Sequence, residues 1–144
     1  MITNELLIAA PVETVWDLTL DVERWPAATP TITSVERLEA GPMRVGSTAR
    51  IVQPKQRPAV WTVTELEPKR TFVWHTKVAW LTMTGGHHLE RAPGGCLNTL
   101  TVDVTGFGAG IVRRLLGRKL QWAIDTENAG FKAAAEAHVG RAAS

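Results

Sequence analysis

The sequence is poor in several features that mark whole classes of protein. Among its 144 residues there is one cysteine, Cys96, so no internal disulfide can form, and a reducing compartment is expected. No apolar run reaches the roughly 18 residues that a transmembrane helix needs. The first residues, MITNELLIAAP, lack the basic leader of a signal peptide. The sequence therefore predicts a cytoplasmic protein without a transmembrane segment.

Charge is also limited, at 21% of residues with a net charge of +2, which neither requires nor excludes a nucleic-acid partner. No nucleic-acid motif is present, so such a partner is not expected. One basic cluster, formed by Arg113, Arg114, Arg118 and Lys119, has few aromatic residues between its cations. Such a cluster is typical of a solvated helix face, with contact to a membrane surface as the alternative. Its role is left open by the sequence.

Patterns for metals and cofactors are missing as well. His87 and His88 are adjacent on an expected strand, where neighbouring side chains point to opposite faces, so they cannot readily bind one ion. The glycines of GFGAG, 106–110, are spaced G-x-G-x-G rather than G-x-G-x-x-G, and no strand follows to complete a dinucleotide site. Neither a metal nor a cofactor is therefore expected.

Tyrosine is absent, yet the chain has six tryptophans. Core packing accounts for several of them, and the others are candidates to line an apolar binding space. They are Trp16, Trp25, Trp61, Trp74, Trp80 and Trp122.

The apolar periodicity predicts a single domain over 1–144 with the order strand, two short helices, six strands and long helix. Consecutive strands joined by short turns indicate an antiparallel sheet and an α+β fold. Pro11 is expected to begin the first helix, and Pro26 to end the second. The expected strands are Ile2–Ala9, Thr31–Glu39, Ser47–Gln53, Ala59–Leu66, Thr71–Lys77, Leu81–Glu90 and Cys96–Thr105.

The last expected helix, Ala109–Ala137, shows an amphipathic pattern. Its apolar stripe is expected to face the strands, with Arg114, Arg118, Asn128 and other polar residues on the opposite side. The stripe is Ile111, Leu115, Trp122, Ala129 and Ala133.

Three stretches carry a resemblance to a known family: APVETVWDLTLDVERWP after the opening strand, the run of hairpins, and ENAGFKAAAE in the last helix. Together they resemble the START-like (SRPBCC) superfamily, in particular its polyketide cyclase/dehydrase and lipid-transport branch. The resemblance implies a helix-grip fold, in which a curved seven-stranded antiparallel sheet grips the C-terminal helix. It also implies an apolar ligand between sheet and helix.

Alternation along the strands then selects the side chains that would face the cavity. His87 is the candidate acid/base, although a structural role for a buried histidine is the more common case. Lys119 lies within the apolar helix face, where lysines usually reach outward. The expected ligand-binding residues are Trp61, Val63, Phe72, Trp74, Met83, His87, Leu100, Val102, Lys119, Trp122 and Thr126.

Three functions are compatible with these patterns. The first is a binding or carrier protein for a hydrophobic small molecule, such as a lipid, a polyketide or an aromatic metabolite. The second is a cyclase/dehydratase in which His87 acts with Lys119 or Thr126. The third, implied by the resemblance, is a ribosome- or membrane-associated interaction factor. The sequence leaves open whether two copies pair as a homodimer.

Overall fold

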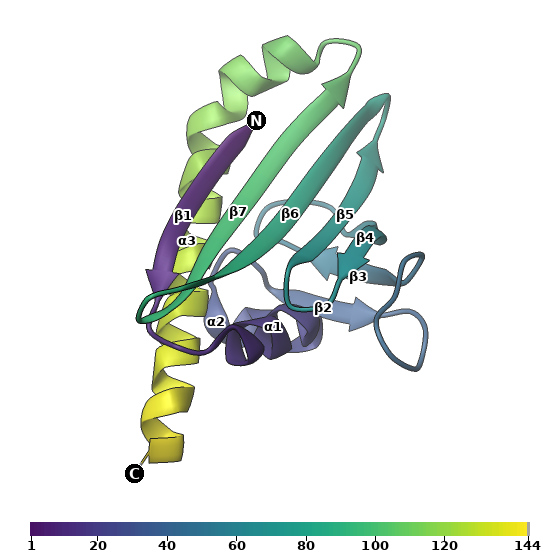
Figure 1. Cartoon of the computed structure of the whole chain (residues 1–144). Coiled ribbons are helices and arrows are strands. Elements are labelled where there is room, and N and C mark those ends of the chain that lie inside the picture. Colours follow the sequence, from purple (N-terminus) through teal and green to yellow (C-terminus); the bar gives the residue numbers. More distant parts are fainter. Residues whose placement is uncertain (144) are drawn as a thin grey trace.

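The computed structural model describes residues 1–143, and side chains as far as residue 141. Seven strands and a long C-terminal helix make up most of it (Figure 1). The strands are β1 (Ile2–Ile8), β2 (Ser34–Arg37), β3 (Thr48–Val52), β4 (Ala59–Glu67), β5 (Thr71–Val78), β6 (Leu81–Ala92) and β7 (Gly95–Gly106). The helices are α1 (Val12–Leu20), a 3-10 turn (Val22–Arg24), α2 (Trp25–Ala28) and α3 (Ala109–Ala143).

The strands form one antiparallel sheet in the order β1-β7-β6-β5-β4-β3-β2. β1 therefore leaves the sequence order and pairs with β7, while every other neighbour is joined by a hairpin or loop. α3 packs along β1 and β7, and α1 and α2 lie near the end of the sheet where β1 finishes (Figure 1). The predicted α+β helix-grip fold with seven strands is confirmed.

Two boundaries differ from the sequence prediction for physical reasons. β2 is four residues long rather than nine, because Thr31 and Ile32 are buried in the connection from α2 instead of pairing in the sheet. Pro26 does not end a helix but lies in the first turn of α2, where its missing N–H costs no hydrogen bond. α3 also runs past its predicted end, to Ala143.

The strand register fixes which side chains share the inner face of the sheet, the face toward α3. Phe72 pairs with His87, which pairs with Leu100 on the next strand. Trp74, Gly85 and Val102 form the neighbouring row, and Thr76, Met83 and Val104 the row after it. These rows agree with the alternation read from the sequence.

The predicted buried face of α3 is wrong. Its stripe, formed by Ile111, Leu115, Trp122, Ala129 and Ala133, is exposed. The residues that pack against the sheet lie on the opposite side of the helix, at the same helical spacing. They are Leu120, Ile124, Asn128, Phe131 and Ala135.

Hydrogen bonds to β1 and β7 favour this orientation of the helix, in addition to its apolar contacts. Asn128, which was predicted to face solvent, is fully buried and donates to the Oδ1 atom of Asn4 at 2.7 Å and to the carbonyl of Asn98 at 3.0 Å. Gln121 and Lys132 donate to carbonyls of β1 on either side of it. Hydrophobic periodicity cannot detect a helix face that is held by such bonds.

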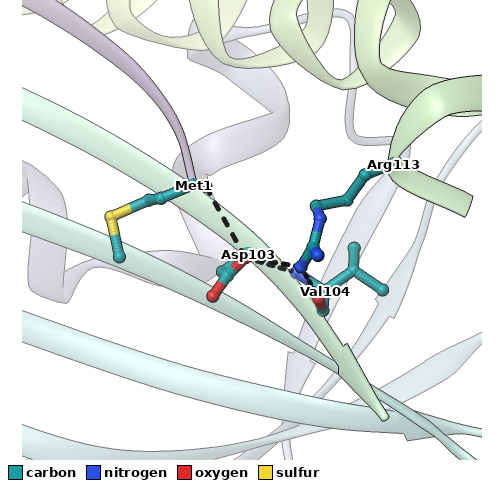
Figure 2. Close-up of polar contacts among 4 residues, drawn as sticks. All are labelled: Met1, Asp103, Val104 and Arg113. Carbon is teal, nitrogen blue, oxygen red and sulfur yellow. Dashed lines mark hydrogen bonds and ion pairs between the residues drawn. The ribbon is translucent and has the colours of Figure 1, made fainter. Parts of the chain in front are cut away.

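The first turns of α3 are anchored to the end of β7 (Figure 2). Arg113 donates to the carbonyl of Val104 at 2.6 Å and lies 3.6 Å from a carboxylate oxygen of Asp103. The amino group of Met1 lies 3.9 Å from the same oxygen. The start of the helix therefore has a fixed position beside the last strand.

Candidate functional site

A cluster of aromatic rings fills the inner face where α2 and α3 approach β4, β5 and β6. The centre of the Trp25 ring lies 5.2 Å from that of Trp74 and 5.1 Å from that of His87. Phe131 of α3 completes the cluster at 5.6 Å from His87. Each strand contributes a ring because alternate residues face inward, and α2 and α3 supply the rest. The members are Trp25, Trp61, Phe72, Trp74, His87 and Phe131.

His87 is a neutral residue inside this cluster. Its side chain is only 7% exposed, and burial lowers its pKa to about 3, with a smaller contribution from His88. At neutral pH the ring can therefore give or take a hydrogen bond, but it is a weak base. Its Nδ1 atom has no hydrogen-bond partner within the described part of the chain.

Trp61 presents a second buried polar atom on the same face. Its Nε1 atom likewise lacks a partner among residues 1–141, and the side chain is 8% exposed. Gly85 lies beside it, where a methyl group would come within 3.6 Å of both Trp61 and Trp74. Buried polar groups are rarely left without a partner, so an oxygen supplied by water or ligand fits here.

A polar group that the sequence reasoning missed is Glu127. This half-buried residue of α3 accepts a hydrogen bond from the Thr31 hydroxyl at 3.2 Å, and Thr31 contacts the Thr29 hydroxyl at 2.9 Å. Burial raises its pKa to about 7, and the bond from Thr31 opposes that shift only in part. Glu127 lies one helical turn before Phe131, on the buried side. The spacing of Ile124 and Phe131 could have located it.

The structure brings together eight of the eleven predicted ligand-binding residues and leaves three apart. The three are on α3: Lys119 and Trp122 are exposed on the side away from the sheet, and Thr126 is half-buried on the flank. Their predicted positions were wrong because the buried face of α3 was assigned to the wrong side of the helix. The eight on the inner face are Trp61, Val63, Phe72, Trp74, Met83, His87, Leu100 and Val102. That they bind a ligand stays a prediction.

The space beside these residues is not uniform along the sheet. Next to α2 the rings fill it, whereas Leu81, Met83 and Gly85, nearer the β5–β6 turn, are half-buried. The inner face is therefore more accessible at that end. A separate hollow of about 780 Å³ lies beside the β4–β5 turn, bordered by the outer-face residues His88, Leu97 and Thr99.

Comparison with known proteins agrees with this architecture. The sequence matches the family described as polyketide cyclase / dehydrase and lipid transport over residues 2–136. The chain belongs to this family. As a member, it shares its fold with aromatase/cyclases of known structure, and the description covers both catalysts and carriers.

The individual relatives of this cyclase/dehydrase family member match it over part of their length or at low sequence identity. A presumed polyketide cyclase of Streptomyces halstedii is 40% identical over 62 residues, which are 41% of this chain and 53% of that protein. The di-domain aromatase/cyclase StfQ of the steffimycin pathway has a TM-score of 0.77 at 16% identity, covering 96% of this chain and 51% of its own. The Zhui aromatase/cyclase of a Streptomyces species has a TM-score of 0.71 at 20% identity, covering 96% and 94%. The chain thus spans about half the length of the Streptomyces halstedii protein and about half the length of StfQ.

The neutral His87 makes a prediction about acid stability. Because its folded pKa of about 3 lies below its ordinary value of 6.5, its contribution to stability is complete above pH 6.5 and is lost as the pH falls toward 3. By linkage this amounts to about 2 kcal/mol of unfolding free energy at pH 5. Urea unfolding at pH 7 and pH 5 should show that the His87→Gln variant loses less unfolding free energy between these pH values than the wild type does. An exposed control, His138→Gln, should keep the wild-type loss.

Glu127 affects the pH dependence of stability in the opposite direction to His87. Its folded pKa of about 7 lies above the ordinary 4.5, so the folded state holds a proton that the unfolded state has lost, and stability falls as the pH rises from 4.5 to 7. Allowing for its partial exposure, Glu127→Gln should raise the unfolding free energy at pH 8 by about 1–2 kcal/mol and change little at pH 4. Urea unfolding at both pH values measures this. An equal gain at both would contradict it.

Proposed function

We propose that the chain binds a largely apolar, oxygen-bearing small molecule of the aromatic polyketide type against the inner face of the sheet. The observation that carries the proposal is the pair of buried polar atoms, Trp61 Nε1 and His87 Nδ1, set among aromatic rings without partners in the described structure. Rings favour a flat apolar ligand, and the two nitrogens favour one with carbonyl or hydroxyl oxygens. The family description and the names of the relatives support this ligand class.

The chemistry of the two nitrogens narrows the ligand further. The indole N–H of Trp61 can only donate, so it requires an acceptor such as a ketone oxygen. A neutral imidazole nitrogen accepts or donates according to its tautomer, so Nδ1 of His87 can meet a phenol or a second ketone. A polyketide alternates such groups along an apolar skeleton, which a simple fatty acid does not.

Two measurements test the binding. Native mass spectrometry of the purified protein detects a retained ligand, and quenching of tryptophan fluorescence by a hydroxylated anthraquinone gives an affinity. Trp61→Phe and His87→Phe keep an aromatic ring but delete the polar atom, so each should weaken binding about tenfold. Trp80→Phe, at an exposed position, is the control and should bind as the wild type does. Unchanged affinity in both inner-face variants would reject the proposal.

A second candidate function, an enzyme of the cyclase/dehydratase type, is favoured by Glu127. A carboxyl with a pKa of about 7 can both remove and return a proton near neutral pH, which His87 with its pKa of about 3 does poorly. As carboxylate it would take a proton from a carbon between two carbonyls. The enolate carbon would then attack another carbonyl of the chain, and the resulting alkoxide would be protonated by the carboxylic acid. Loss of that hydroxyl as water, after removal of a neighbouring proton, would complete an aromatic ring.

This function is separated from simple binding by a pair of variants. On a poly-β-ketone substrate that the wild type converts, Glu127→Gln should reduce turnover about 10²–10⁴-fold while anthraquinone binding stays within about twofold. Glu136→Gln, on the same helix but paired with Lys132 at the surface, should retain turnover. If the wild type binds the substrate but does not convert it, the enzyme function is rejected and only the carrier function remains.

A further inference from the structure

Large apolar side chains are exposed to solvent at the β5–β6 turn and at the start of α3. Trp80 and Phe107 are 70% and 86% exposed, although protein surfaces rarely present aromatic residues so fully. Their backbones lie side by side, because Leu81 pairs with Gly106 and Trp80 and Phe107 are the next residues outward. Figure 1 shows these two connections at the same end of the sheet.

The misassigned stripe of α3 continues this surface. Ile111, Leu115 and Trp122 are 67%, 74% and 60% exposed and share one side of the helix. The bonds from Arg113 to the end of β7 hold the first turns of α3 in place (Figure 2), and Phe107 precedes these turns directly in the sequence. Five exposed apolar side chains thus come from the β5–β6 turn, the β7–α3 connection and one side of α3, and these segments adjoin one another.

The charges around this group are mostly positive, and the two acids that border it, Asp103 and Asp125, are already paired with Arg113 and with Asn4 and Gln121. No Asp or Glu occurs from Val104 to Ile124 or from Pro68 to Leu89. Arg114, Arg118 and Lys119 are exposed, and none has an ion pair or hydrogen bond with any described residue. A shallow hollow of about 430 Å³ lies between Gly108, Ile111 and Arg114. Unpaired cations beside exposed aromatic residues match the composition of surfaces that contact lipid headgroups.

We propose that this basic aromatic patch docks on the surface of an anionic lipid membrane. It consists of Trp80, Phe107, Ile111, Arg114, Leu115, Arg118, Lys119 and Trp122. In this arrangement the rings enter the headgroup layer and the cations meet lipid phosphates. The contact is peripheral, since no helix among the described residues is long and apolar enough to cross a membrane.

The charge distribution favours lipid over a second copy of the chain. In a two-fold symmetric pair built on this patch, the same surface meets itself, so Arg114, Arg118 and Lys119 would face the same cations of the partner. A bilayer containing phosphatidylglycerol supplies the opposite charge and an apolar layer together. The proposal does not depend on the ligand or reaction assigned to the inner face.

Vesicle co-sedimentation of the full chain tests the docking. At low salt, binding to vesicles of phosphatidylcholine with phosphatidylglycerol should exceed binding to phosphatidylcholine alone by about tenfold or more, and added sodium chloride should weaken it. Removing two cations with Arg114→Gln and Arg118→Gln should lower the partition coefficient about fivefold per arginine. Trp80→Ser with Phe107→Ser should lower it further, because the rings no longer enter the bilayer.

Matched variants elsewhere on the surface serve as controls. Leu38→Ser with Val45→Ser removes exposed apolar side chains, and Arg50→Gln with Arg57→Gln removes exposed cations, all from the β2–β4 region. These should bind vesicles like the wild type. Equal binding to both vesicle types, or equal losses in patch and control variants, would overturn the proposal. So would light scattering that shows a dimer broken by the patch variants, together with absence of vesicle binding.

Discussion

Replacing Gly130 by alanine should destabilise the protein by about 3 kcal/mol or more, which for a chain of this size lowers the melting temperature by about 10 °C. A methyl group at this position of α3 would lie 2.0 Å from the carbonyl oxygen of Ala28. That oxygen is backbone at the end of α2 and cannot rotate away as a side chain could. Either α2 shifts, together with Trp25 and the aromatic cluster, or α3 does. Thermal unfolding followed by circular dichroism measures the loss.

A second glycine of α3 provides a control, because its replacement by alanine should raise stability rather than lower it. Gly117 has nothing within 4 Å of the position that a methyl group would take, so Gly117→Ala should raise stability by about 0.5–1 kcal/mol through helix propensity alone. Comparing the two separates the packing of α3 on α2 from the intrinsic preference of the helix. If both variants were stabilised, α2 would not be held against the helix as described.

The inner face of the sheet could be predicted from the sequence because strand alternation is a local property. Phe72, Trp74 and His87 each follow the simple rule that every second residue faces the same way. The fold followed for a similar reason, since consecutive short turns restrict strands to antiparallel neighbours. Pairing of β1 with β7 joins strands that lie far apart in the sequence, and no local pattern predicts it.

The helix face could not be predicted because two apolar stripes compete on α3. One contains Ile111, Leu115 and Trp122 and has the larger side chains. The other contains Ile124 and Phe131, with Asn128 between them in the helical pattern. Polar hydrogen bonds with β1 decide between them, and those partners lie more than 100 residues away in sequence. Correcting the helix face removes Trp122 from the candidate site and places it on an exposed surface.

Correcting the helix changes which acid/base groups lie on its buried side. With the predicted orientation, Lys119 and Thr126 would face His87 across the cavity. With the observed one, Glu127 and Phe131 lie on the buried side, and Phe131 touches His87. Burial moves the pKa values of these two titratable groups apart, lowering that of His87 to about 3 and raising that of Glu127 to about 7.

Asn128→Ala should cost about 3 kcal/mol or more of unfolding free energy, because one side chain serves both β1 and β7. Its amide donates to Asn4 and to the carbonyl of Asn98, and its oxygen accepts from the Asn98 amide at 2.9 Å. Both Asn98 and Asn128 are fully buried, so the groups left behind have no water to replace the lost partner. Urea unfolding at neutral pH measures the loss.

An exposed position in the same network provides the comparison. Asp125 accepts from Asn4 and Gln121 at 2.8 Å each, but it is accessible to water, so Asp125→Ala should cost less than about 1 kcal/mol. Asn98→Ala combined with Asn128→Ala should cost clearly less than the sum of the two single variants, because each single variant already breaks their shared bond. Additive losses would mean that the two amides act independently, and the orientation of α3 would then rest on Ile124 and Phe131 rather than on this pair.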